Sequence, residues 1–241
     1  MDALEAAAAS AHAVSYVTSR FMLDGNTYKR GAELGFAGLD FYITGRGGVL
    51  GDVDADVVAA AFAFFEPGHV RTQWELGTAV MPATRAGQEF AACAYAWAGQ
   101  YVPDDLDVVR LGELAGRAAQ GGRVACAPVF AEWRRLAVPE DPKAAVVHHM
   151  NSLRELRQQL HSACVLAHGV TPLEAVSVNS PAMAPLFGWA DLADTDGSTE
   201  PMARAEEATN RALAHTFEAL TGAERAEFVE LAGALDAATS G

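Results

Sequence analysis

Cysteine, lysine and long apolar runs are all scarce in this 241-residue sequence. The three cysteines, Cys93, Cys126 and Cys164, are odd in number and widely separated, which argues against a disulfide framework and against a zinc knuckle. No stretch approaches the roughly 18 uncharged apolar residues of a membrane span, and the first residues lack the basic leader and apolar core of a signal peptide. Together these absences predict a cytoplasmic protein.

Positive charge is also in short supply. Lysine and arginine together number 17 against 31 aspartates and glutamates, which gives a formal net charge of −14. Such a surface repels phosphate backbones and anionic membranes. A recognition helix for DNA needs clustered basic residues, whereas Arg204, Arg211 and Arg225 are scattered over the acidic segment that follows residue 187. We therefore expect no nucleic acid and no membrane among the partners.

The pattern that is present is helical. Apolar residues recur mostly at helical spacing, alanine is abundant, and the alternating β-branched runs typical of strands are scarce. Asp141-Pro142, Thr171-Pro172 and the pair of Thr221 and Glu224 are typical helix starts. We predict an all-α multi-helix bundle with a C-terminal two-helix appendage and little or no β-structure. The predicted helices cover residues 3–22, 28–44, 55–65, 68–77, 83–101, 105–119, 127–136, 142–168, 172–179, 201–219 and 222–238.

The expected domain organisation follows from one irregular segment. Residues 179–200 are rich in Pro, Gly, Ser and Asp, which is typical of a loop or linker. This segment separates a main helical domain, residues 1–178, from a helical pair, residues 201–241, that we expect to pack on the main domain. Because the pair is alanine-rich and amphipathic, it could also join two copies of the chain as a homodimer.

A glycine-rich segment, TGRGGVLGDVDADVV at residues 44–58, approaches three ligand-binding motifs without matching any of them. Its glycines miss the dinucleotide-binding spacing by one position, the Gly-Lys-Ser/Thr of a phosphate loop is absent, and the Gly and Glu of a calcium loop are missing. A connection between two helices, with Asp52 or Asp54 as a cap, explains the segment more simply. Arg46 could bind an anionic ligand here or pair with one of the aspartates.

A histidine-rich segment, AVVHHMNSLRELRQQLHSACVLAHG at residues 145–169, contains four of the seven histidines. At about 100° per residue it divides into three stripes. The apolar stripe, which should face the core, consists of Leu153, Leu156, Leu160, Ala163 and Ala167. The two polar stripes are His148, Asn151, Ser152, Glu155, Gln159 and Ser162, and Arg154, Arg157, His161 and His168. The polar stripes either line a pocket or are solvated, as most charged helix faces are.

The polar stripes contain the residue types of acid–base chemistry. His148 and Glu155 lie two turns apart, about 10 Å along the axis, and could hold one small molecule between them. His161 lies beside Arg154 and Arg157, which should lower its pKa and keep it neutral, so that it can act as a base. We predict His148, Glu155, Arg154 and His161 as catalytic residues and His12, Tyr42, Arg46, Asn151 and Arg157 as ligand-binding residues. No cofactor is predicted, and a metal held by His12, His148 and Glu155 is the remaining alternative.

Three segments carry a resemblance to a known family: AHAVSY, FYITGRGGVLGDVDADVVAAAFAFFEPGHV, and the histidine-rich segment followed by GVTPLEAV, which with the spacing between them cover most of residues 10–178. The chain resembles a family of mostly actinobacterial helical proteins that is loosely labelled helix-turn-helix or winged-helix. That family's pattern has a His six positions ahead of Arg-Glu-His-Arg-Gly-Asp-Gly-His. The matching positions are His148, Arg154, Glu155, Arg157 and His161, whereas Leu156, Gln158, Gln159 and Leu160 replace the inner residues. The resemblance implies a fold and a set of charged residues, and no reaction.

Several classes of function remain. The first is a small-molecule enzyme without a covalent intermediate that isomerises, dehydrates, cyclises or hydrolyses a moderately apolar metabolite, for example in specialised metabolism. No nucleophile elbow is present, which argues against covalent catalysis. The alternative is a non-catalytic small-molecule-binding or sensor protein in which aromatic segments such as Phe62-Ala63-Phe64-Phe65 enclose a cavity. A metal- or haem-binding protein and a DNA-binding regulator are less favoured.

Overall fold

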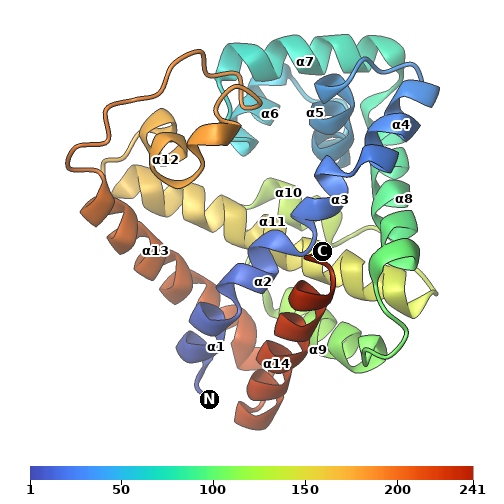
Figure 1. Cartoon of the computed structure of the whole chain (residues 1–241), viewed down its shortest axis with the longest axis vertical. Helices are drawn as coiled ribbons and strands as arrows, with labels where there is room; N and C mark the ends of the chain where they lie inside the picture. Colours follow the sequence, from blue (N-terminus) through green and yellow to red (C-terminus); the bar gives the residue numbers. More distant parts are fainter. Residues whose placement is uncertain (241) are drawn as a thin grey trace.

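Helices account for all the regular structure of the computed structural model, which describes residues 1–240 (Figure 1). No strand occurs in this range, and this confirms the all-α fold class. The α-helices are α1 (Ala3–Ala9), α2 (Ala11–Tyr16), α3 (Ser19–Leu23), α4 (Gly25–Glu33), α5 (Leu39–Gly47), α6 (Ala55–Ala61), α7 (Pro67–Val80), α8 (Ala83–Tyr101), α9 (Val108–Gly121), α10 (Pro128–Trp133), α11 (Pro142–Ala167), α12 (Pro172–Asn179), α13 (Thr199–Ala214) and α14 (Gly222–Ala238). Short 3-10 helices are η1 (Gly48–Leu50), η2 (Pro181–Met183) and η3 (His215–Ala219). None of these helices combines the length and the apolar character that crossing a bilayer requires.

The N-terminal part breaks into more helices than the sequence predicts. The single helix predicted at 3–22 is wrong: the structure has α1, α2 and α3 there, and the hydroxyl of Ser10, at the first break, donates to the carbonyl of Ala6 at 2.8 Å. Such local side-chain bonds compete with helix continuation. The single helix predicted at 28–44 is also wrong, because Gly35 and Gly38, with φ angles of 99° and 147°, separate α4 from α5.

The glycine-rich segment joins α5 to α6, although part of it is helical itself. Gly45 and Gly47 belong to α5, and a Cβ on Gly45 would lie 2.7 Å from Cβ of Phe90, so glycine here permits close packing of α5 on α8. Gly51, with a φ of 81°, forms the turn after η1. The carboxylate of Asp54 then accepts a hydrogen bond from the backbone N–H of Asp56 at 2.8 Å, which confirms the predicted cap of α6.

The histidine-rich segment forms α11, which crosses the middle of the molecule in Figure 1 and packs against α8, α9, α10 and α13. Leu153 and Leu156 are fully buried, as the apolar stripe predicts. Ala163 and Ala167, assigned to the same stripe, are exposed, because α12 and α13 cover a different side of the helix at this end. The prediction of a core-facing stripe therefore holds for the first part of α11 only.

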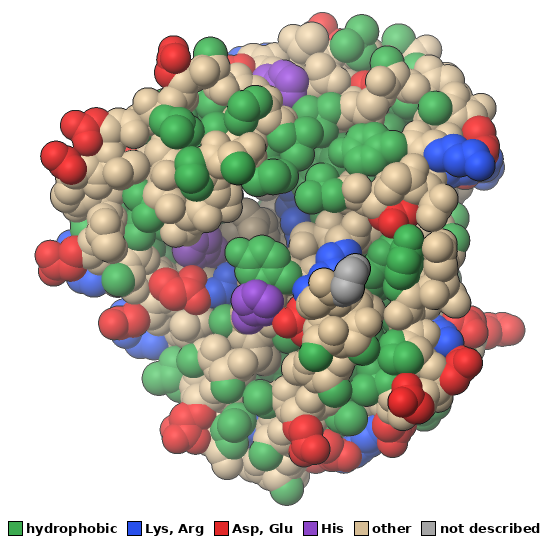
Figure 2. Space-filling view, in the orientation of Figure 1, with side chains coloured by type: hydrophobic (Ala, Val, Ile, Leu, Met, Phe, Trp, Pro, Cys, Tyr) green, Lys and Arg blue, Asp and Glu red, His purple; other side chains and the backbone are tan. Residues whose placement is uncertain are grey.

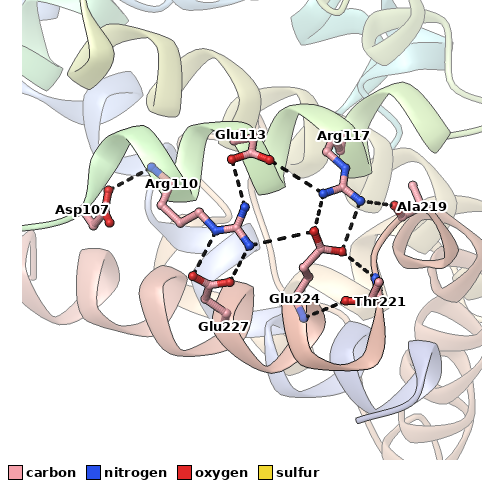
Figure 3. A network of polar contacts seen from close by, with 8 residues as sticks. All are labelled: Asp107, Arg110, Glu113, Arg117, Ala219, Thr221, Glu224 and Glu227. Carbon is pink, nitrogen blue, oxygen red and sulfur yellow. Dashed lines mark hydrogen bonds and ion pairs between the residues drawn. The ribbon is translucent and has the colours of Figure 1, made fainter.

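The C-terminal helices pack on the remainder of the bundle. Phe217 and Phe228 are fully buried in the same hydrophobic cluster as the residues of α8, α9 and α11. A network of ion pairs joins α9 to α14 at the surface (Figure 3). In this network, Arg110 donates to both oxygens of Glu227 at 3.0 and 2.7 Å, and Arg117 donates to Glu224. This packing brings α13 alongside α11, where it forms one wall of the candidate site.

Candidate functional site

A cavity of about 840 Å³ lies between α2, α3, α5, α11 and the segment from α12 to α13. Figure 2 shows a hollow near the centre of this face, with blue Lys or Arg surface inside it. Its apolar walls include Met22, Phe62, Phe64, Phe65, Met183 and Phe187, and its polar lining includes Arg46, Arg154, Arg157, Gln158, His161 and Glu206. The cavity therefore has a charged side on α5, α11 and α13 and aromatic walls elsewhere.

Arg46, Glu155 and Arg154 form a buried charged group at the cavity. Arg46 donates from Nε and Nη2 to the two carboxylate oxygens of Glu155 at 2.8 and 2.7 Å, and Arg154 Nη1 donates to Oε1 at 2.7 Å. Burial alone would raise the pKa of Glu155, but the two guanidiniums outweigh it and hold that pKa below its usual range. Arg46 also lies over the ring of Phe62 at 4.4 Å. Glu155 is thus a fully buried, ionised counter-ion, and it does not itself line the cavity.

A second charged group connects α11 to α13. Arg157 Nη2 donates to Oε1 of Glu206, whose other oxygen lies 3.6 Å from Nδ1 of His161. The same Nδ1 lies 3.0 Å from the hydroxyl oxygen of Thr209. The single hydroxyl proton of Thr209 is donated to the carbonyl of Ala205 at 2.7 Å, so the oxygen can only accept from His161. This arrangement assigns the proton to Nδ1 and leaves Nε2 as the bare nitrogen.

The imidazole of His161 is suited to accept a proton. Burial lowers its pKa below 6.5, Arg157 lowers it further, and Glu206 offsets only part of this effect. The direction is the one predicted from the sequence, but burial is the larger cause. Nε2 has no hydrogen-bond partner among residues 1–240, and His161 lines the cavity. The imidazole is therefore neutral near neutral pH, with a free lone pair.

Three guanidiniums and the carboxylate of Glu206 line the charged side of the cavity, and the buried carboxylate of Glu155 lies behind them, so one positive charge is in excess. Arg154 uses one guanidinium nitrogen in its bond to Glu155, and Arg157 uses one in its bond to Glu206. No hydrogen bond within residues 1–240 engages their other guanidinium nitrogens. A locally cationic cavity in a chain of net charge −14 favours an anionic guest.

The structure brings together at one cavity several of the catalytic and ligand-binding residues predicted from the sequence. Those that line the cavity are His12, Tyr42, Arg46, Arg154, Arg157 and His161. His12 lies at the exposed rim, where its Nδ1 is 2.9 Å from a carboxylate oxygen of Asp236. Arg46 pairs with Glu155, and the alternative pairing with Asp52 or Asp54 is not found.

His148 lies apart from this cavity. Its Nδ1 is 3.0 Å from the hydroxyl of Tyr95, the ring of Trp133 stacks on it, and its exposed fraction is 1%. Burial, with a smaller contribution from His149, lowers its pKa to about 4. The expectation that His148 and Glu155 hold one molecule between them does not match this geometry, because α11 meets α8 and α10 at His148 and α5 at Glu155. The polar stripe of His148 and Glu155 is nevertheless buried, so the solvated interpretation is wrong for it.

Asn151 also lies away from the cavity. It is fully buried, and neither its amide oxygen nor its amide nitrogen has a partner among residues 1–240. The proposed metal set is not assembled either, since His12, His148 and Glu155 have three different sets of partners. Residues 1–240 contain no group of three or more His, Cys, Asp and Glu side chains placed to hold a metal ion.

Sequence reasoning missed Glu206 and Thr209. Both lie on α13, which the sequence assigns to an appendage, and a pattern within one helix does not reveal which side chains of another helix it meets. The spacing of Glu206 and Thr209, three residues apart on one face of α13, is the only sequence signal that relates them. The aromatic segment Phe62-Ala63-Phe64-Phe65, by contrast, lines the cavity with three of its rings.

The fold and the site define an all-helical protein with a cationic cavity. The chain belongs to a helix-turn-helix family, whose model matches residues 2–191, and this confirms the resemblance seen in the three sequence segments. Comparison with curated proteins and with solved structures gave no match. The matched range contains the cavity walls from α1 to η2 and ends ahead of α13, which supplies Glu206 and Thr209.

Proposed function

We propose that the cavity binds a moderately apolar organic acid and that His161 transfers a proton within it. The observation that carries this proposal is the position of a neutral imidazole, with Nε2 free, on the same cavity wall as Arg154 and Arg157. Aromatic side chains on the remaining walls suit an apolar body. The proposal needs no metal and no cofactor.

The guanidiniums account for recognition of the acid. Arg154 and Arg157 keep N–H groups that are not used by Glu155 and Glu206, and hydrogen bonds between guanidinium and carboxylate groups are among the stronger ones in proteins. Arg46 donates two hydrogen bonds to the carboxylate of Glu155, so it contributes charge and stays in place. A ligand carboxylate on Arg154 would lie beside an aromatic wall formed by Phe62 and its neighbours.

The reaction that this geometry supports is proton abstraction next to a carbonyl. The C–H proton passes to Nε2 of His161, and the electron pair moves into the carbonyl to form an enolate. The guanidiniums stabilise the negative charge that develops on the enolate oxygen. Return of the proton at a different atom gives isomerisation, and departure of a hydroxide from the neighbouring carbon gives dehydration. Both outcomes need a base and cations, and neither needs a covalent intermediate.

Binding without catalysis is the second candidate, because the same cavity would serve a sensor. The family's helix-turn-helix description hints at DNA binding as a third. The net charge of −14 weighs against a DNA partner, since nucleic-acid affinity depends on neutralising phosphates with several basic residues. Many of the arginines are also paired with carboxylates of the same chain.

Phenylpyruvate is a suitable probe, because it combines a carboxylate, an enolisable carbonyl and an apolar ring. We expect it to bind, as measured by calorimetry, and we expect its C3 protons to exchange with deuterated solvent faster with the protein than without, as followed by proton NMR. His161→Gln should abolish the exchange with little loss of binding. Arg154→Gln should weaken binding by about tenfold or more, the value of one lost charge-assisted hydrogen bond.

His168→Gln is the matched control, since His168 lies at the end of the same helix and does not line the cavity. It should leave both binding and exchange unchanged. If phenylpyruvate binds but its C3 protons do not exchange faster, the enzyme candidate is rejected and the non-catalytic binding protein is retained. If phenylpyruvate does not bind at millimolar concentration while a random DNA duplex does, the proposal fails in favour of the DNA-binding candidate.

A further inference from the structure

Glu206 lies between two groups that compete for its carboxylate. Its Oε1 accepts a hydrogen bond from Arg157, while its Oε2 lies 3.6 Å from Nδ1 of His161, which is beyond normal hydrogen-bond length. The side chain is 42% exposed, so packing does not lock it in one orientation. In the ligand-free protein Glu206 therefore binds Arg157 and only faces His161.

We propose that Glu206 is a positioning residue that changes partner when an organic anion enters the cavity: the anion binds Arg157, and Glu206 moves onto the Nδ1–H of His161, where it replaces the hydroxyl oxygen of Thr209 as the acceptor. The inference rests on the proposed function, because it concerns the same base and the same class of ligand. It goes further in that it couples ligand binding to the state of the base.

Arg157 provides the reason for the exchange. Only its Nη2 is bonded to Glu206, and its Nε is buried without a partner among residues 1–240. A buried donor without an acceptor is costly. A ligand carboxylate that binds the guanidinium side-on can accept from two nitrogens, so it competes favourably with the single bond of Glu206.

His161 is placed to respond to this exchange. The charged groups that face it are Arg157 on its own helix and Glu206 on α13, and the ring of Phe64 lies 5.8 Å away on a third side. Neutralisation of Arg157 by a ligand and closer approach of Glu206 act in the same direction, since each raises the pKa of His161. The imidazole would then be a stronger base with ligand bound than without it.

The test is a double-mutant cycle on the pKa of His161 in the ligand-free protein, measured by NMR of its ring nitrogens. The four proteins are the wild type, Arg157→Gln, Glu206→Gln and the double variant, with His161→Asn used to assign the signal. Loss of Arg157 imitates the ligand-bound state, because it releases Glu206. We expect Arg157→Gln to raise the pKa of His161 more in the presence of Glu206 than in its absence.

Two fixed charges that do not move contribute additively, so an equal rise in both backgrounds would overturn the proposal. Glu207→Gln is the matched control: Glu207 is the neighbouring carboxylate on α13, is 70% exposed and pairs with Arg211. It should not alter the pKa of His161. If Arg157→Gln does not fold by circular dichroism, Arg157→Met replaces it in the cycle, because methionine also removes the charge and the donor that hold Glu206 and keeps an unbranched side chain.

A second measurement uses phenylpyruvate as the probe. At saturation it should raise the pKa of His161 in the wild type by more than in Glu206→Gln. Failure of phenylpyruvate to bind would count against the proposed function, whereas the ligand-free double-mutant cycle would still test the movement of Glu206. If the cycle is additive and phenylpyruvate binds normally, the proposed role of Glu206 is wrong, and the proposed function of the cavity and of His161 is retained.

Discussion

The two halves of α11 contain the same kinds of side chain in different surroundings. The first half places His148 against Tyr95 and Trp133, in a region without a charged partner. The second half places His161 beside Arg157 and Glu206, at the wall of the cavity. Burial lowers the pKa of both imidazoles, yet only the second has a free nitrogen at a space that a ligand can enter.

The difference teaches that the elements packed against a helix decide what its polar residues do. Where α8 and α10 cover α11, a histidine becomes a neutral member of the core. Where α5 and α13 cover it, carboxylates and guanidiniums balance one another and leave donors at a cavity. Substitutions in the two halves should therefore change the stability of the protein, and its dependence on pH and salt, in different ways.

Glu155→Gln should have the largest effect on stability. The substitution leaves Arg46, only 3% exposed, without its counter-ion, and breaking a buried ion pair by removing one partner costs about 3 to 5 kcal/mol. Urea unfolding near neutral pH measures the loss. Glu207→Gln, an exposed carboxylate on α13, should cost far less. Equal losses in the two variants would contradict the assignment of Glu155 as the buried counter-ion.

His148 should make the stability of the protein depend on pH. Its pKa is about 4 in the folded protein against 6.5 ordinarily, so between these values the unfolded chain binds a proton that the folded protein does not. The free energy of unfolding therefore falls as the pH decreases from about 6.5 to 4, and this one group contributes about 3 kcal/mol to the loss.

The measurement compares urea unfolding at both ends of this pH range in the wild type and in His148→Gln. The other titrating groups are the same in both proteins, so the difference isolates His148. The variant should lose less stability on acidification than the wild type does. If the two pH profiles are parallel, the imidazole is already protonated, or it is not buried, in the folded protein.

Asn151 lies between the two halves of α11, and replacing it tests whether water or another polar partner reaches this part of the helix. Its amide is fully buried without a partner among residues 1–240, and an unsatisfied buried amide is costly. Asn151→Leu, a change of similar size, should stabilise the protein by about 1 kcal/mol in urea unfolding. Ser152→Ala is the contrasting variant and should destabilise it, because the hydroxyl of Ser152 donates to the carbonyl of His148 at 3.0 Å. Destabilisation by Asn151→Leu would instead indicate a polar partner for the amide.

Much of the fold could be predicted from local patterns, because capping and helix period are local properties. Thr171 and Thr221 begin α12 and α14 with capping boxes, as the sequence indicates, and α8 has the predicted ends. The breaks at Ser10 and Gly38 were not predicted, since neither residue interrupts the apolar period. They depend on a local side-chain bond and on a backbone angle that only glycine adopts readily.

The candidate site was only partly predictable for a related reason. The periodicity of α11 placed Arg154, Arg157 and His161 on one stripe, and all three line the cavity. It could not show that Glu155 faces Arg46, which lies 109 residues earlier in the chain, or that α13 contributes Glu206. Those contacts depend on how helices pack, and the sequence of one helix does not contain that information.

Glu224→Gln should have the smallest effect and completes the comparison with Glu155. Glu224 accepts from Arg117 in the surface network of Figure 3, where solvent and salt screen the charges. The hydrogen bond from Arg117, with a smaller contribution from the backbone N–H of Thr221, lowers the pKa of Glu224 to about 2. Its contribution is present above the ordinary pKa of 4.5 and is lost as the pH falls toward 2. Glutamine can keep the capping bond to Thr221, so we expect a slight loss in urea unfolding that disappears at about 1 M salt. The loss caused by Glu155→Gln should persist at that salt concentration, because burial excludes the ions from Arg46 and Arg154; a loss that salt removes in both variants would place the two carboxylates in the same kind of environment.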